Sequence, residues 1–211
     1  LEWDKPDPRE LRANIAELAK KHPKNFYILS QQARRAINAR DWEAAKAHCR
    51  KLIKLFPRQN GGANNPYVLL AKAHRELKEF SEERKTLETL AGMSDDGYDV
   101  FLRLIELTAE AEDWDAVRLN CERALAVNPL LPQPHRQLAR AAEARNQPTA
   151  AIESWQTLLH LDPLDPAEAH YHLALLLRET DNAKAKRHLL MGLEEAPRFR
   201  AALKLLLEWD K

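Results

Sequence analysis

The segment DWEAAKAHCRKLIKLFP, residues 41–57, recurs as DWDAVRLNCERALAVNP at residues 113–129. Tryptophan, cysteine and the final proline stand at matching offsets in the two copies, which are 72 residues apart. A third segment, EFSEERKTLETL, lies between them and has Phe80 where the copies have Trp42 and Trp114. This divides the separation into 38 and 34 residues and indicates a repeated unit of about 34 residues.

The period continues towards the end of the chain. Thirty-four residues beyond Pro129 stands Pro163, after AAIESWQTLLHLDP, and 34 residues further stands Pro197, after AKRHLLMGLEEAP. Because proline cannot continue a helix, each of these residues is expected to follow the second helix of its unit. Five units are thus in register.

These residues as a set resemble the tetratricopeptide repeat family. Its pattern has a large apolar residue at position 4, small residues at 8, 20 and 27, an aromatic residue near 17, and proline at 32. Repeat 1 fills these positions with Leu29, Ala33, Ala45, Leu52 and Pro57. The resemblance covers nearly the whole chain and implies an all-α solenoid of antiparallel helix pairs that winds as a right-handed superhelix.

Small residues at positions 8 and 20 would let the two helices of a pair approach closely. Two residues depart from the family pattern: Glu83 stands at a position that is usually small, and Pro148 at the position that is usually aromatic. The loop RQNGGANNP, Arg58–Pro66, is rich in turn residues and lengthens repeat 1 by four residues.

The repeats divide the chain, which we expect to form a single solenoid over residues 1–211. The predicted parts are an N-terminal half repeat 1–25, repeat 1 with its inserted loop 26–63, repeat 2 at 64–97, repeat 3 at 98–131, repeat 4 at 132–166, repeat 5 at 167–197, and a C-terminal half repeat 198–211.

Both ends of the chain look like half a repeat, and both contain LEWDK, at residues 1–5 and 207–211. Joining residues 198–211 to residues 6–25 gives 14 + 20 = 34 residues, one complete unit. We therefore expect either a longer array or head-to-tail association of copies, unless the matching ends are an artefact of how the segment was bounded. The residues assigned to this self-association are Leu11, Ile15, Leu18, Leu203, Leu206 and Trp209.

Composition and charge narrow the class of protein. The 33 basic and 32 acidic residues leave a net charge of +1, which argues against nucleic-acid binding. No apolar run is long enough to span a membrane, and the first ten residues lack a signal-peptide pattern. The start at Leu1 suggests an excised fragment. Two cysteines, Cys49 and Cys121, fit a reducing compartment, so a cytoplasmic location is expected.

No motif points to catalysis. The GxxxxGK, HExxH and GxSxG patterns are absent from the sequence, so we predict a protein that is not an enzyme and has no cofactor or metal. His170 and His172 stand two apart on a predicted helix and would face different directions. Cys49 and Cys121 occupy the same seam position in repeats 1 and 3 and are expected to be core thiols, and Trp155 also stands at a seam position.

In the family that the chain resembles, first helices line a concave groove that grips a peptide. Carried over by position, the ligand-groove residues are Tyr27, Arg34, Lys72, Arg103, Arg136, Arg140, Tyr171 and His172. This mostly basic set predicts a protein or peptide partner with acidic groups. Alternatively, the arginines pair with acids at the rims, such as Glu76, Glu110, Glu143 and Glu179. The carboxylate clamp of chaperone-binding members is disfavoured, because Ser30, Arg34 and Leu69 replace its lysine and asparagines.

The predicted function is a non-catalytic protein-interaction scaffold that binds peptides in its groove, assembles through its ends, or both. A second possibility is a non-catalytic domain of a larger enzyme or of a secretion or assembly protein. Nucleic-acid binding by the arginine-bearing helices is a third, weakened by the near-zero net charge.

Overall fold

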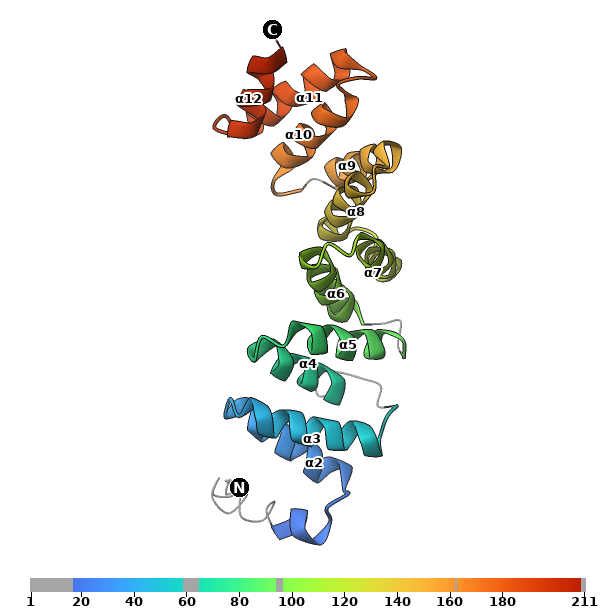
Figure 1. Ribbon diagram of the computed structural model, residues 1–211, viewed down its shortest axis with the longest axis vertical. Coiled ribbons are helices and arrows are strands. Elements are labelled where there is room, and N and C mark those ends of the chain that lie inside the picture. The colour runs from blue at the N-terminus through green and yellow to red at the C-terminus, as the bar shows by residue number, and fades with distance from the viewer. Residues whose placement is uncertain (1–16, 59–64, 94–96, 162, 210–211) are drawn as a thin grey trace, which may run out of the picture. The chain divides into compact units, whose positions relative to one another are not determined.

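The structure, a computed structural model, describes residues 17–58, 65–93, 97–161 and 163–209. These residues form helices joined by short turns, with no strand among them (Figure 1). The chain divides into two compact units, residues 1–95 and 96–211, which are described separately. The all-α fold of antiparallel helix pairs predicted from the sequence is confirmed.

The described residues of unit 1 form two helix pairs, preceded by a short helical stretch at residues 17–21. Each helix packs on the next, and the first helices of the two pairs also contact each other. The pairs are α2 (Phe26–Asn38) with α3 (Trp42–Leu55), and α4 (Pro66–Glu76) with α5 (Phe80–Ala91). The predicted insertion falls between them, and its residues 59–64 lie outside the described part of the chain.

Unit 2 contains three helix pairs and one further helix, again packed in sequence. Its elements are α6 (Tyr98–Glu110) with α7 (Trp114–Val127), α8 (Pro132–Ala144) with α9 (Pro148–His160), α10 (Pro166–Leu177) with α11 (Asn182–Glu195), and α12 (Arg200–Trp209). The first helices α6 and α8 contact each other, as α2 and α4 do in unit 1.

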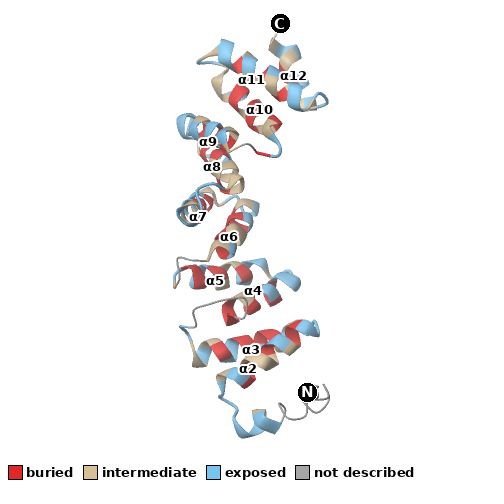
Figure 2. Ribbon diagram, turned by 180° about the vertical axis from the view of Figure 1, so that it is seen from behind, coloured by how far each residue is buried: buried red, intermediate tan, exposed pale blue. Residues whose placement is uncertain are grey.

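The core follows the seams between paired helices, where Figure 2 shows the buried residues gathered. Two positions on the second helices are almost completely buried in every pair. The first position holds Ala45, Glu83, Val117, Ala151 and Ala185, and the second, one helical turn later, holds Cys49, Leu87, Cys121, Trp155 and Leu189. The seam positions predicted for both cysteines and for Trp155 are confirmed. Four of the five side chains at the first position are small, which allows the close approach of the two helices.

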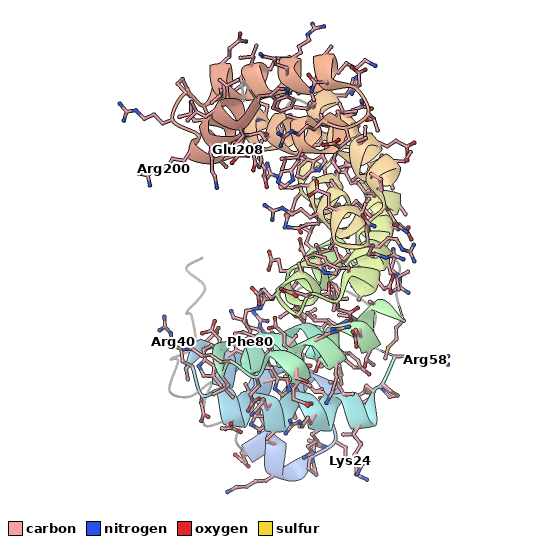
Figure 3. The ribbon with its side chains drawn as sticks, turned by 45° about the horizontal axis from the view of Figure 1, so that its top comes forward. Lys24, Arg40, Arg58, Phe80, Arg200 and Glu208 are labelled. Atoms are coloured by element: carbon pink, nitrogen blue, oxygen red, sulfur yellow. The ribbon has the colours of Figure 1, made fainter. Side chains whose placement is uncertain are left out.

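Four of the five turns between the two helices of a pair have the same backbone conformation. The residue before the cap of the second helix adopts a left-handed conformation with φ between 54° and 61°, at Arg40, Lys78, Glu112 and Asn146. The amide of the next residue then donates to a carbonyl five residues back, which satisfies the end of the first helix. Figure 3 places Arg40, in the α2–α3 turn, and Phe80, at the start of α5, on the same side of unit 1, with Arg58 on the opposite side.

The α10–α11 turn differs from the other four. Thr180 stands 34 residues after Asn146, but it is not left-handed, and the Asp181 amide donates to the carbonyl of Leu177, only four residues back. The two helices also approach unusually closely. A Cβ atom on Gly192 would lie 3.2 Å from the Ala167 carbonyl oxygen and from His170 Cβ, so a larger residue there would require these neighbours to shift.

Candidate functional site

Four of the predicted groove residues come together on the first helices α8 and α10 of unit 2. We define the α8–α10 face by Arg136, Arg140, Glu143, Glu168, Tyr171 and His172. The repeat brings them together because α8 and α10 occupy equivalent places in consecutive helix pairs. Two ionic groups cross from one helix to the other on this face, and aromatic rings lie beside them.

The first ionic group is a glutamate shared by two arginines. One carboxylate oxygen of Glu168 accepts a hydrogen bond from Arg140 Nη2, and the other lies 3.2 Å from Arg136 Nε. The three side chains are between 21% and 45% exposed, so the group is open to solvent from one side. The Arg136 Nε atom itself is buried and makes no hydrogen bond. Three charges in this group sum to one net positive charge.

The second ionic group is centred on Glu143. Its carboxylate accepts a hydrogen bond from Trp155 Nε1 at 2.5 Å and another from His172 Nδ1 at 2.9 Å. The His172 ring stacks on the Trp155 ring with centroids 4.7 Å apart and an angle of 17° between the planes. Glu143 thus fixes the orientation of His172 and satisfies the only polar atom of a fully buried tryptophan side chain.

A hollow of about 500 Å³ adjoins the face at the start of α10. It is lined by Asp165, Ala167, Glu168, Ala196, Pro197, Arg198 and Phe199. The ring of Phe199 packs on that of Tyr171 with centroids 5.1 Å apart. Glu168 therefore contacts the arginines of α8 and also lines a hollow with an aromatic and aliphatic wall.

The remaining predicted groove residues lie elsewhere. Arg103 on α6 pairs with Glu106 of its own helix at 2.8 Å. Tyr27, Arg34 and Lys72 belong to unit 1, where the Tyr27 side chain is 67% exposed and the two basic residues are also exposed. Neither Arg34 nor Lys72 forms an ion pair with a described residue. The predicted groove residues therefore fall into separate groups in the two units.

The alternative of arginines paired with acids holds for three of the predicted arginines, but with acids other than those predicted. The partners are Glu106 and Glu168 rather than Glu76, Glu110, Glu143 or Glu179. Glu143 was predicted at the rim and instead binds Trp155 and His172. An acid two residues into the next first helix can reach back to the preceding one, which the rim prediction did not consider.

The residues predicted for self-association have mixed environments. Leu203 is 41% exposed and Leu18 is 43% exposed. Leu206 and Trp209 instead pack on the core of the α10–α11 pair, where Trp209 Nε1 donates to Asn182 and Arg178 stacks over the Trp209 ring. Leu207, not assigned before, is 71% exposed. Leu11 and Ile15 lie outside the described residues.

Two histidines and both cysteines lie in the seams between helices. His170 Nδ1 lies 3.0 Å from His188 Nδ1 in the α10–α11 seam, and burial lowers the pKa of both rings. His172 faces another side, as its spacing from His170 predicted. Burial raises the pKa of the Cys49 and Cys121 thiols to about 12, which leaves them unreactive at neutral pH. Within the described residues, no three metal-ligating side chains cluster, and no helix could cross a bilayer.

Sequence reasoning missed Glu168 and Phe199 as members of the site. A usable signal existed, because ionic partners on adjacent first helices are separated by slightly less than one repeat. Arg140 and Glu168 are 28 residues apart, and Glu143 and His172 are 29 apart. An arginine or histidine at this spacing from a glutamate is the pattern that both groups share.

Comparisons with known proteins identify the fold. No family model and no curated protein matches the chain, but solved structures do. A structure of YrrB, described as a TPR protein with an unusual peptide-binding site, matches 90% of this chain and 96% of its own, with a TM-score of 0.70 and 16% identity. MamA from Desulfovibrio magneticus RS-1 matches 83% of this chain and 97% of its own, with a TM-score of 0.61 and 15% identity.

A third match is to a chain in the structure of Naa15/Naa10 bound to HypK-THB. It covers 98% of this chain but only 32% of that chain, with a TM-score of 0.71 and 19% identity. At these identities the likeness concerns the fold alone. The fold is the tetratricopeptide-type repeat of helix pairs that the sequence predicted.

Proposed function

We propose that this chain is a non-catalytic protein-interaction scaffold that binds peptide segments on the surfaces of its first helices. The observation that carries the proposal is the α8–α10 face, where arginines, aromatic rings and a hollow of about 500 Å³ lie together. Arginine donates paired hydrogen bonds to carboxylates, and aromatic rings add contact area at low entropic cost. Such a face suits a peptide that carries acidic and apolar groups.

The fold favours the same proposal. A stack of helix pairs presents repeated, solvent-facing helix surfaces, which suit extended partners better than small substrates. YrrB is described as having an unusual peptide-binding site, and the Naa15/Naa10 structure contains bound HypK-THB. The thiols of the described chain are buried and protonated, His170 and His188 contact each other in a seam, and His172 binds Glu143, so these groups favour a binding role over a reactive one.

A peptide selection tests this proposal. A phage-displayed library of random peptides is selected on the immobilised chain, and the enriched peptides are then measured against variants. We expect enriched peptides to carry acidic residues and to lose binding to Arg140→Glu, because that change reverses a charge on the α8–α10 face. Arg118→Glu is the matched control, since Arg118 is equally exposed on the second helix α7. Equal losses for both variants, or no enrichment, contradict the proposal.

Self-assembly is a second candidate, supported by the outer side of α12. Leu203 and Leu207 are exposed there, while the opposite side of the helix packs on the core of the α10–α11 pair. An exposed apolar stripe on a first helix that has no paired second helix among the described residues would be covered by a second helix from another copy. Light scattering over a wide concentration range tests this. A mass that rises with concentration and stays monomeric in Leu203→Glu/Leu207→Glu supports assembly, and a monomer throughout refutes it.

A further inference from the structure

The Glu168 carboxylate is the starting point. It accepts a hydrogen bond from Arg140 and lies against Arg136, so one acid of α10 pairs with two arginines on α8. Its side chain is 21% exposed, and it also lines the neighbouring hollow. The chain itself therefore demonstrates that a carboxylate fits between these arginines.

The fit between Glu168 and the arginines is incomplete. Arg136 Nε is buried and makes no hydrogen bond, although Glu168 Oε2 is 3.2 Å away, so the contact is ionic without hydrogen-bond geometry. A buried donor without an acceptor costs free energy, and a carboxylate able to approach Arg136 in the plane of its guanidinium would recover it. Glu168 is tethered to α10 and divides its two oxygens between two arginines. A free carboxylate has no such restraint.

The hollow beside Glu168 gives an incoming ligand a second contact. Ala167, Ala196, Pro197 and Phe199 supply apolar surface, and Arg198 at its edge is exposed and forms no ion pair with a described residue. A peptide carboxylate placed at Arg136 and Arg140 would therefore have an apolar side chain of the same peptide within reach of Phe199. Charge complementarity selects the acid, and the hollow selects its apolar neighbour.

We infer that Glu168 is an internal occupant of a carboxylate-binding site on α8, and that a peptide binds there by displacing it. The inference deepens the proposed function and rests on it, because it names the ligand group and the residue that competes with it. The competition lowers the apparent affinity for acidic peptides, since each binding event must first release Glu168 from both arginines. It also gives specificity, because a ligand without a carboxylate would leave Arg136 and Arg140 unpaired once Glu168 is displaced.

If Glu168 competes with the peptide, removing its charge should tighten peptide binding, whereas removing a purely structural ion pair should not. Glu168→Gln keeps the size of the side chain but removes the competing charge. We expect its dissociation constant for an acidic peptide to fall by about twofold to fivefold, the range that corresponds to one partly exposed ion pair. Glu106→Gln makes the same charge change on α6, where Glu106 pairs with Arg103 of its own helix, and is expected to leave the dissociation constant unchanged.

Fluorescence anisotropy with three labelled peptides makes the test. The first is a Gly-Ser linker that ends in leucine with a free carboxylate, the second is its C-terminal amide, and the third is the amide with a glutamate before the leucine. Tighter binding of the first probe alone to Glu168→Gln identifies a terminal carboxylate as the ligand group. Tighter binding of the third identifies a side-chain carboxylate, and in both cases Arg136→Gln/Glu168→Gln should lose the gain.

Other outcomes overturn the inference. Unchanged or weaker binding of every probe to Glu168→Gln refutes internal competition, as does an equal gain in Glu106→Gln, which indicates bulk electrostatics. The absence of binding by all variants also refutes it. The peptide selection separates these failures from failure of the proposed function, because peptides that depend on Arg140 preserve the scaffold proposal even when Glu168 plays no part. Thermal melts of each variant verify that it is folded.

Discussion

The helix pairs α4–α5 and α8–α9 share a backbone arrangement but satisfy the polar groups of their seams in opposite ways. In α4–α5 the small-residue position holds Glu83, fully buried, whose carboxylate accepts a hydrogen bond from Arg75 at 2.7 Å. In α8–α9 that position is Ala151, and the polar atom is instead the indole nitrogen of Trp155 one turn later. One pair buries a charge and the other buries a large ring with a single donor.

This difference shows that the repeat fixes the positions of side chains more strongly than their chemistry. Both pairs draw the compensating group from the first helix, Arg75 from α4 and Glu143 from α8. A buried polar group is tolerated wherever the first helix offers a partner within reach. Substitutions that remove either partner should therefore lower the free energy of unfolding by different amounts in the two pairs.

The largest effect is expected at Trp155. Trp155→Ala empties a fully buried site, so the free energy of unfolding should fall by about 3–5 kcal/mol, whereas Trp155→Phe should lose only about 1–2 kcal/mol with the hydrogen bond to Glu143. Urea unfolding followed by circular dichroism measures both changes. A loss in Trp155→Phe as large as in Trp155→Ala would show that the hydrogen bond, not the packing, dominates this seam.

The next effect is expected at the ion pair of α4–α5, in which Glu83 is buried and Arg75 is about half exposed. Arg75→Ala leaves the Glu83 carboxylate without its Arg75 contact in a site of 0% exposure, and should destabilise the pair by about 2–3 kcal/mol. The double variant Arg75→Ala/Glu83→Ala restores the alanine found at this position in three other pairs. It should be more stable than Arg75→Ala alone. Hydrogen exchange of α4 and α5 amides measures this locally, and an unaffected Arg75→Ala would mean that other contacts of Glu83 suffice.

The two pairs should also differ in their response to acid. At the N-cap of α5, Glu79 binds Lys46 and His74 instead of capping its helix, while Gln147 stands at the N-cap of α9. The hydrogen bond from Lys46, then that from His74, lowers the pKa of Glu79 below its ordinary 4.5. Folded protein thus binds fewer protons here than unfolded protein.

It follows that the contribution of Glu79 to stability is present above pH 4.5 and is lost as the pH falls through its lower folded pKa. Glu79→Gln copies the residue of the α9 cap and should reduce the stability difference between about pH 7 and about pH 3.5. Urea unfolding at the two pH values measures this. An undiminished difference in the variant would place the acid sensitivity in other carboxylates.

The sequence predicted the positions in these pairs well and their partners poorly. Cys49, Cys121 and Trp155 lie in the seam as predicted, because the 34-residue period determines which residues face it. The departure at Glu83 was visible in the sequence, but its burial against Arg75 was not. Likewise, Arg136 and Arg140 were predicted, yet their partner Glu168 was not. Partners on neighbouring helices depend on the stagger between helices and on rotamers, neither of which the period contains.

The smallest effect concerns the turns. Lys78 and Asn146 are the left-handed residues of the two pairs, with φ of 61° and 54°. This conformation is sterically unfavourable for lysine because of its Cβ atom, whereas asparagine adopts it readily. Lys78→Gly should therefore raise the free energy of unfolding by about 0.5–1 kcal/mol, after the entropic cost of glycine is deducted, while Asn146→Gly should change it little.

Thr180→Gly, in the α10–α11 turn without a left-handed residue, should be destabilising, because there glycine brings only its entropic cost. Thermal melts of the three variants measure these changes. Equal gains in all three would show that the turns respond to chain flexibility and not to the left-handed backbone that separates four of them from the fifth.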